Sequence, residues 1–468
     1  MSRLIWRAAN QLSSEYVRYR RYIDRYVRLS REDASREATR TLYQYLTYCR
    51  AYSTFWRDRW PKEGQEFSPE EANDVLALLP RLTKADLRDH LNEIWISPAT
   101  RRPGDGFPTL GRQTRMDSGG STGVPTTVYT DTFTSARERA TRDFLYELCG
   151  LVPGDRFFFV WGSPNELLDA KSSLRKRLSS RLRGTVWIPA FSLTSEEIKA
   201  ILQSINEQTS VRSAICFATA LETILDFVQR EGLKPRLLDR AFSGGGLLHS
   251  HLRQAALQHF AREIFDTYAG RDIGIVAHET PAHDGLSTVG WFSRVEVLDE
   301  AGRRAEPGQQ GEVHVTQMNN YSCALIRLAT GDTACWQPDP GAGPLPTSRL
   351  TGLAGRLADR LRGPNGVVLD PAAVIHLVGV VIRPAWLRKF QLVQHAADSY
   401  SLKVESWIDE VPQEELKEFE RQFAAELCNL MRSKVEGRVV LVKEIPRLPS
   451  GKHLYCATEL GQDPLGGR

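Results

Sequence analysis

The chain has 468 residues, 41% of them hydrophobic and 25% charged, which is typical of a soluble globular protein and too long for a single compact core. Its formal net charge of +4 gives no electrostatic reason to expect a nucleic-acid partner. No apolar run reaches the length of a membrane-spanning helix and the start lacks a signal-peptide core, so we expect a cytoplasmic protein with no membrane partner.

Residues 1–100 have a helical pattern. Aromatic and aliphatic side chains recur at three- and four-residue steps, while arginines occupy much of the remainder. The first group comprises Tyr16, Tyr19, Tyr22, Ile23, Tyr26 and Val27, and the second Arg18, Arg20, Arg21, Arg25 and Arg28. A basic membrane-surface helix would have this pattern. A helix that docks its aromatic face on the main body has it too, and we favour this interpretation.

Residues 155–275 alternate between short apolar runs and segments at helical spacing. The runs at 157–161, 186–191 and 214–218 are expected to be buried strands. Helical spacing between strands is seen, for example, in Leu221, Ile224, Leu225 and Val228. The pattern predicts an α/β sheet with helices on both faces.

Residues 291–336 change to strand alternation with turns at Ala301-Gly302 and Pro307-Gly308, as expected of a small antiparallel unit. Beyond about residue 360 we expect strands at 387–395, 401–409 and 438–445 and an amphipathic helix at 413–434. The fold class is therefore α/β: a helical segment (1–100), a large α/β domain (101–359) and a small, mobile α+β C-terminal domain (360–468).

The stretch DSGGSTGVPT (117–126) combines three glycines with hydroxyl side chains. Such a loop can turn tightly and surround an anion with backbone N–H groups and hydroxyls, which suits a polyphosphate. It lacks the Lys-Ser/Thr of the Walker motif and the glycine spacing of the dinucleotide fingerprint. Taken alone, a Gly/Ser loop is more often only a flexible turn.

Five further fragments occur in a fixed order. They are FSGGGLLHS (242–250), YAGRDIGIVAHET (268–280), LIRLATGDTA (325–334), GRLADRLRGPNGV (355–367) and IPRLPSGKHLY (445–455). With the Gly/Ser loop, this series resembles the motifs of the acyl-adenylate-forming (ANL) superfamily, in its phenylacetate-CoA ligase-like (CapK-like) branch. The resemblance runs from about residue 100 to the end, so the N-terminal helices are the part that the motifs do not explain.

The resemblance implies a role for each fragment. In that family a carboxylate attacks the α-phosphorus of ATP and pyrophosphate leaves, so the site must hold the triphosphate and balance its charge. The β- and γ-phosphates would be held by Ser118, Gly119, Gly120, Ser121, Thr122 and Gly123. The adenine would lie against Gly244, Gly245 and Gly246 and stack on Tyr268, residues that otherwise would form a turn and a core position.

The acidic and basic positions follow from the same resemblance. Asp272 stands where the family has a magnesium-associated glutamate, so Mg²⁺ is an expected cofactor beside ATP. Asp332 would accept both ribose hydroxyls, Arg356 would reach the ribose or phosphate, and Asp359 would mark the hinge. Lys452 would enter from the C-terminal domain and act catalytically between the α-phosphate and the carboxylate.

Two departures from the family pattern affect the metal and phosphate sites. Relatives with a zinc site have a Cys/His set, of which this chain offers only His278, His283 and Cys335, with Thr280 in place of a cysteine. The seven cysteines contain no Cys-x-x-Cys pair, so we expect no disulfide framework and no structural zinc. Val124-Pro125-Thr126 also lacks the lysine of the commoner phosphate loop, so other cations must balance the phosphate charge.

The sequence says least about the pocket that would bind the carboxylic acid. Trp161, Phe217 and Ala218 would line it and suit an aryl or other apolar acid, although the same residues could be plain core. The implied activity is AMP-forming acid activation followed by thioester formation with coenzyme A. An adenylating enzyme that passes the acyl group to a carrier protein, amine or other small nucleophile is one alternative, and a non-catalytic binding protein of the same fold is another. The sequence specifies neither the acid nor the oligomeric state.

Overall fold

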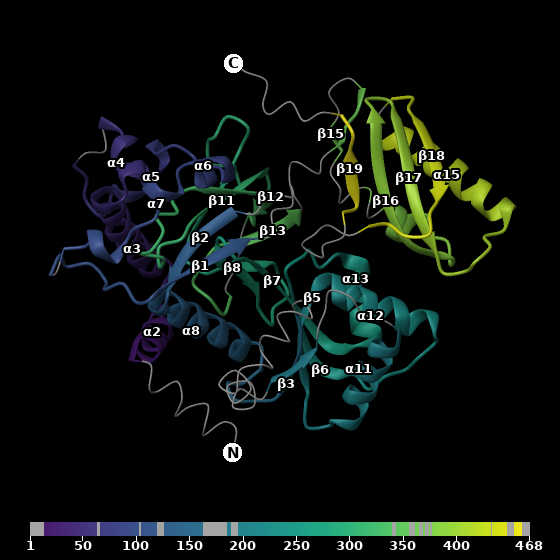
Figure 1. The fold of residues 1–468 in the computed structure, drawn as a ribbon, viewed down its shortest axis with the longest axis horizontal. Coiled ribbons are helices and arrows are strands. Elements are labelled where there is room, and N and C mark those ends of the chain that lie inside the picture. The colour runs from purple at the N-terminus through teal and green to yellow at the C-terminus, as the bar shows by residue number, and fades with distance from the viewer. Residues whose placement is uncertain are drawn as a thin grey trace.

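The computed structural model describes residues 14–62, 66–102, 104–118, 126–161, 185–188, 195–338, 343–354, 361–364, 368–369, 374, 377–431, 433–446 and 454–460. Figure 1 shows a large body and a small C-terminal domain that lies over one corner of it. No helix within these described ranges combines the length and apolarity needed to cross a bilayer.

The N-terminal segment is helical, as predicted. It comprises α2 (Ser14–Tyr26), α3 (Arg31–Tyr52), α4 (Thr54–Asp58), α5 (Ala72–Leu78), α6 (Lys84–Asp89), α7 (Leu91–Ile94) and a 3₁₀ turn (Pro98–Thr100). Side-chain caps set several starts: the Ser30 hydroxyl accepts from the Asp33 N–H before α3, and Thr83 and Asp86 form a capping box at α6.

Helix α2 docks its aromatic face, which confirms the second interpretation of its pattern. Tyr16, Tyr19, Ile23 and Tyr26 are buried there. The Tyr19 hydroxyl donates to the Trp291 carbonyl at 2.6 Å. This face packs against α8 (Thr132–Leu148), and both helices lie together at one end of the body (Figure 1).

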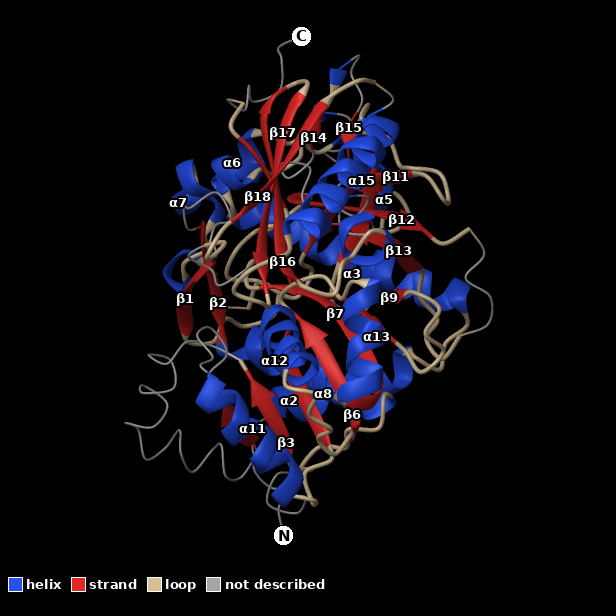
Figure 2. Cartoon of the chain, turned by 90° about the vertical axis from the view of Figure 1, so that its right-hand side faces the viewer, coloured by secondary structure: helices blue, strands red, loops and turns tan. Residues whose placement is uncertain are grey.

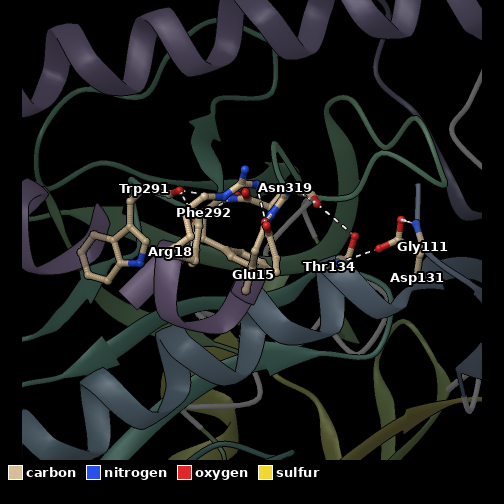
Figure 3. Close-up of polar contacts among 10 residues, drawn as sticks. Glu15, Arg18, Gly111, Asp131, Thr134, Trp291, Phe292 and Asn319 are labelled. Carbon is tan, nitrogen blue, oxygen red and sulfur yellow. Dashed lines mark hydrogen bonds and ion pairs between the residues drawn. The ribbon is translucent and has the colours of Figure 1, made fainter. Parts of the chain in front are cut away.

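A buried polar network fixes the start of α2 (Figure 3). The Arg137 guanidinium of α8 pairs with Glu15 at 2.5 Å, with both side chains less than a tenth exposed. The Asn319 side-chain amide donates to the Trp291 carbonyl, and the backbone carbonyl of Asn319 accepts from the Thr134 hydroxyl. The N-terminal segment is thus joined to the main body by paired charges as well as by apolar packing, which keeps the buried polar groups satisfied.

The main body is built on one mixed eleven-stranded sheet in the order β10-β11-β12-β13-β9-β8-β7-β6-β5-β3-β4. Its strands are β3 (Phe157–Val160), β4 (Thr185–Ile188), β5 (Ser213–Phe217), β6 (Leu238–Gly244), β7 (Ala261–Gly270), β8 (Gly274–Glu279), β9 (Leu286–Thr288), β10 (Arg294–Leu298), β11 (Gln310–Thr316), β12 (Leu328–Trp336) and β13 (Arg349–Ala354). The strands from β3 to β7 pair in parallel, and the others pair antiparallel. Residues 291–336 form the predicted antiparallel strands β10, β11 and β12. These strands are part of the large sheet, because β13 and β9 join them edge to edge to the rest of it.

The parallel half is covered by α11 (Ser195–Glu207), α12 (Ala218–Arg230) and α13 (Ser250–His259). Helix α12 begins directly after β5, and its apolar residues Leu221, Ile224, Leu225 and Val228 are at most 1% exposed. A separate hairpin, β1 (Gln113–Ser118) with β2 (Thr126–Asp131), pairs Ser118 with Thr126.

The C-terminal domain has its own core. Strands β16 (Leu387–Ala396), β17 (Ser399–Ser406), β18 (Glu436–Leu441) and β19 (Cys456–Thr458) form a sheet in the order β18-β17-β16-β19. Helix α15 (Gln413–Met431) covers it with Phe419, Phe423, Leu427 and Met431, close to the predicted helix 413–434. Short strands β14 (Leu361–Arg362) and β15 (Val368–Leu369) and a π-helical turn (Leu377–Val381) precede this sheet. The predicted boundary near Asp359 lies outside the described residues, so the domain limits remain a prediction.

Candidate active site

The predicted nucleotide-binding residues that the structure describes come from three strands of the sheet and the turns that follow them. Gly244 ends β6 and Gly245 and Gly246 follow it, Tyr268 belongs to the adjacent β7, Asp272 is in the turn after β7, and Asp332 is in β12. In α/β sheets, ligands bind outside the carboxyl ends of parallel strands, and both β6 and β7 end here.

Tyr268 and Asp332 are in direct contact, although 64 positions separate them in the chain. The Tyr268 hydroxyl donates to Asp332 Oδ2 at 2.8 Å. Burial, followed by the charge of Asp332, raises the pKa of Tyr268 well above its usual value, so the hydroxyl keeps its proton and remains a donor. The Asp332 backbone N–H donates to the Thr330 hydroxyl at 3.1 Å. The Tyr268 hydrogen bond holds the carboxylate in one orientation, and the Thr330 bond fixes the backbone at Asp332.

The glycine loop packs against the residues predicted to line the acid pocket. Gly245 has a φ of +73°, and a Cβ added there would lie 2.2 Å from Cε2 of Phe217. A Cβ on Gly246 would meet the Ala218 methyl at 3.1 Å. The Trp161 and Phe217 rings meet edge to face, with centroids 5.3 Å apart. The structure thus brings the predicted adenine loop and the expected pocket residues together, and only glycine fits at position 245.

Asp272 has a partner that the sequence analysis missed. Lys84 Nζ of α6 lies 3.3 Å from Asp272 Oδ2, and the two side chains are 28% and 9% exposed. Helix α6 also packs against β2, the strand that follows the Gly/Ser loop. The Thr83–Asp86 capping box could have predicted the start of α6, but no local pattern indicates that Lys84 reaches a carboxylate so far along the chain.

Several predicted residues fall outside the description. Ser118 ends β1, and its side chain is not described. The remaining residues of this kind are Gly119, Gly120, Ser121, Thr122, Gly123, Arg356, Asp359 and Lys452. Their roles remain predictions.

The partial zinc set is not brought together. Cys335 lies on β12, which β13 and β9 separate from the His278 strand β8. His278 instead contacts Cys149, with Nε2 and Sγ 3.7 Å apart, and burial lowers the pKa of the imidazole to about 3. Among the described residues, no group of three or more histidine, cysteine, aspartate or glutamate side chains could hold a metal ion. The expectation of no structural zinc stays a prediction, which metal analysis of the purified protein can check.

No family model matches the sequence, and no curated protein is detectably similar to it. Solved structures do match, among them four of 2-hydroxyisobutyryl-CoA ligase, three of which represent different states of that enzyme. The postadenylation state in complex with R3-HIB-AMP has a TM-score of 0.72 at 17% identity, over 92% of this chain and 91% of that chain. An open conformation with 2-HIB-AMP and CoA scores 0.58 at 18% identity, over 91% and 92% of the two chains. The thioesterification state scores 0.53 at 18% identity, over 93% and 92%.

At 17–18% identity, these structural matches show the fold that the chain shares with the ligase. Because the three structures are of one ligase in different states, their different TM-scores reflect how its parts are arranged. This chain agrees better with the postadenylation structure than with the other two. The chain therefore has the fold of an acyl-adenylate-forming ligase.

Proposed function

We propose that this protein activates a carboxylic acid with ATP and transfers the acyl group to coenzyme A. A carboxylate oxygen attacks the α-phosphorus and pyrophosphate leaves, which gives an acyl-adenylate. The thiol of coenzyme A then attacks the acyl carbon, its proton is lost, and AMP leaves. The observation that carries the proposal is the Tyr268–Asp332 contact beside the Gly245 loop, in a fold shared with a ligase captured with an acyl-adenylate.

The predicted site residues would have different roles in binding and catalysis. Asp332, oriented by Tyr268, would accept the ribose hydroxyls, and the backbone of Gly244–246 would allow a close approach of the adenine. Lys452 would stabilise the charge that develops at the α-phosphate. The aromatic walls formed by Trp161 and Phe217 favour an aryl acid as substrate.

Asp272 and Lys84 provide opposite charges at the phosphate end. Mg²⁺ binds through one or two carboxylates together with substrate phosphates and waters, so the single carboxylate of Asp272 fits a metal shared with ATP. The bound ion would neutralise phosphate charge. Lys84 lies beside that carboxylate, and we propose that its ammonium supplies part of the positive charge that the loop lacks at 124–126.

An ATP–pyrophosphate exchange screen over aryl and fatty acids tests this function. We expect exchange with at least one acid, loss of exchange in Lys452→Ala, and thioester formation when coenzyme A is added. Exchange without transfer to coenzyme A would direct the search to carrier proteins and amines as acceptors. A protein that binds no adenine nucleotide would overturn the proposal.

A further inference from the structure

Helix α12 presents two different faces. Its apolar residues are buried under the sheet, whereas Glu222, Asp226 and Arg230 follow one another at four-residue steps and so share the other face. We call these three residues the α12 stripe. The C-terminal domain lies over this helix in both views (Figures 1 and 2). Each member of the stripe interacts with that domain.

The first contact is a hydrogen bond between the domains. The Tyr455 hydroxyl donates to Glu222 Oε1 at 2.6 Å. Burial and the nearby Glu222 raise the pKa of Tyr455 well above its usual value, so the hydroxyl remains a donor at every physiological pH. The ring lies between His249 of the main body and Phe390 of β16, with centroid distances of 5.4 and 5.2 Å.

The last contact is made by Arg230 at the end of α12. Its guanidinium carbon lies 5.3 Å from the ring centroid of Trp407, which follows β17 in the C-terminal domain. Arg388 of β16 lies at the same distance from that ring. Arg230 also pairs with Glu231 at 2.9 Å, so the guanidinium is held in place on the helix. Cation–π contacts of this kind stabilise an interface modestly.

Between these contacts is a cavity of about 310 Å³ at the junction of the two domains. Asp226 faces it together with Glu222, with His251 of α13 and with three bases of the C-terminal domain, Arg383, Arg388 and Lys389. Burial and, to a smaller extent, repulsion from Glu222 raise the pKa of Asp226 to about 7, although the three bases act in the opposite direction. Burial lowers the pKa of His251, whose Nδ1 has no hydrogen-bond partner within the described structure.

Tyr455 is also three residues from Lys452 in the sequence. The Tyr455 carbonyl accepts from the Leu392 N–H at 2.8 Å, and the Leu454 carbonyl accepts from the Gln391 side chain at 2.9 Å. The segment that follows Lys452 is therefore attached to β16 on one side and to Glu222 on the other. Loss of the Glu222 hydrogen bond would leave this segment with the packing of the Tyr455 ring on His249 as a weaker contact with the main body.

We propose that the α12 stripe is a docking site for the C-terminal domain, which selects the arrangement seen here and positions the segment that carries Lys452. The docking of the C-terminal domain does not depend on the proposed function, whereas its effect on the rate of acyl-adenylation rests on that function. Glu222 and Tyr455 are positioning residues, because they act on the acyl-adenylation step through the placement of Lys452. Since docking stabilises one arrangement, its loss shifts the population toward others and lowers the rate of that step.

Tyr455→Phe tests the docking site while keeping the ring that packs on His249 and Phe390. A hydrogen bond to a charged acceptor is worth roughly 1.4 kcal/mol or more, so we expect about a tenfold lower rate of ATP–pyrophosphate exchange. The affinity for ATP should not change, because the nucleotide residues belong to the main body. Glu222→Ala should have the same effect, and the double variant should be no worse than either single one, because both remove one bond. Glu222→Gln, which keeps an acceptor oxygen, should recover part of the rate.

Tyr400→Phe is the matched control. Its hydroxyl donates to the Ala397 carbonyl at 2.8 Å within the C-terminal domain, so its loss removes a tyrosine hydroxyl without touching the interface. We expect Tyr400→Phe to keep the wild-type exchange rate at a temperature at which the variant is folded. Small-angle X-ray scattering supplies a readout without activity: Tyr455→Phe and Glu222→Ala should increase the radius of gyration, and Tyr400→Phe should not.

The two proposals fail in different ways. If no acid supports exchange but scattering changes in the two interface variants, the docking site stands and the enzymatic proposal falls. If the wild type is active and Tyr455→Phe keeps both its exchange rate and its scattering profile, the docking site is overturned. Losses that add in the double variant would also overturn it, because they would mean that Tyr455 and Glu222 act independently.

Discussion

Replacement of Gly245 by alanine should destabilise the protein in a way that can be separated into two parts. The backbone there has a φ of +73°, which costs a residue with a Cβ about 1–2 kcal/mol. The new methyl would also lie 2.2 Å from Cε2 of Phe217, whose ring is buried against Trp161. Overpacking of this kind costs about 1–3 kcal/mol more. We therefore expect a total loss of about 2–5 kcal/mol in the free energy of unfolding.

Gly232→Ala isolates the backbone part. Gly232 follows α12 with a φ of +61°, and an added Cβ would meet nothing within 4 Å. Urea denaturation of both variants should give a difference of about 1–3 kcal/mol, which is the contribution of the Phe217 contact. In a Phe217→Ala background the difference should disappear, because the ring that obstructs the methyl is absent.

Equal losses for Gly245→Ala and Gly232→Ala would refute the close packing of the glycine loop on Phe217. The position of the loop beside the expected acid pocket, which depends on this packing, would then be wrong as well. Gly245→Ala should also weaken ATP binding, whereas Gly232→Ala should leave it unchanged, and fluorescence titration with a labelled ATP analogue measures both.

Four further predictions concern charged groups. Lys452→Ala should nearly abolish ATP–pyrophosphate exchange and leave ATP affinity intact, and unchanged exchange would remove this lysine from the mechanism. Asp332→Ala should instead weaken ATP binding by about tenfold or more, since a charged hydrogen-bond acceptor is lost, and isothermal titration would detect an unaltered affinity that contradicts the ribose role. Lys84→Met should raise the KM for ATP and leave Asp272 without its cation; a KM equal to that of the wild type would show that the lysine is structural only. The pKa of Asp226 is raised to about 7 in the docked arrangement, so its protonated form favours docking. If the carboxyl titrates normally when undocked, docking should weaken by up to about tenfold from pH 6 to pH 8, and Asp226→Asn should remove this dependence in scattering measurements.

Much of the fold could be predicted from local patterns. The apolar runs at 157–161 and 214–218 became β3 and β5, and the stripe at 413–434 became α15, because a buried strand and an amphipathic helix each impose a short-range period. The continuity of the sheet from β10 to β4 could not be predicted in this way. It depends on β13 and β9, which pair only through the Arg349–Ser287 and Leu350–Leu286 registers between distant segments.

The candidate site likewise combines features that local sequence predicts with contacts that it does not. Motifs indicated Tyr268 and Asp332, because each lies in a recognisable local sequence. Their mutual hydrogen bond, the approach of Lys84 to Asp272 and the contact of Tyr455 with Glu222 were not predicted. Each of these joins segments that no periodicity relates, so only the packed tertiary structure reveals them.

Lys84 and Arg327 together limit how this protein can be recombined with others of its fold. Arg327 of the LIRLATGD motif donates to the carbonyls of Ala77 and Leu79 at the end of α5, at 2.8 and 2.6 Å. A chimaera that exchanged the first hundred residues would keep the pairing of Arg327 with Glu296 but would remove the Ala77 and Leu79 carbonyls from the buried guanidinium and the Lys84 ammonium from Asp272. Designers should transfer that segment together with the strands that it contacts, or expect a less stable hybrid.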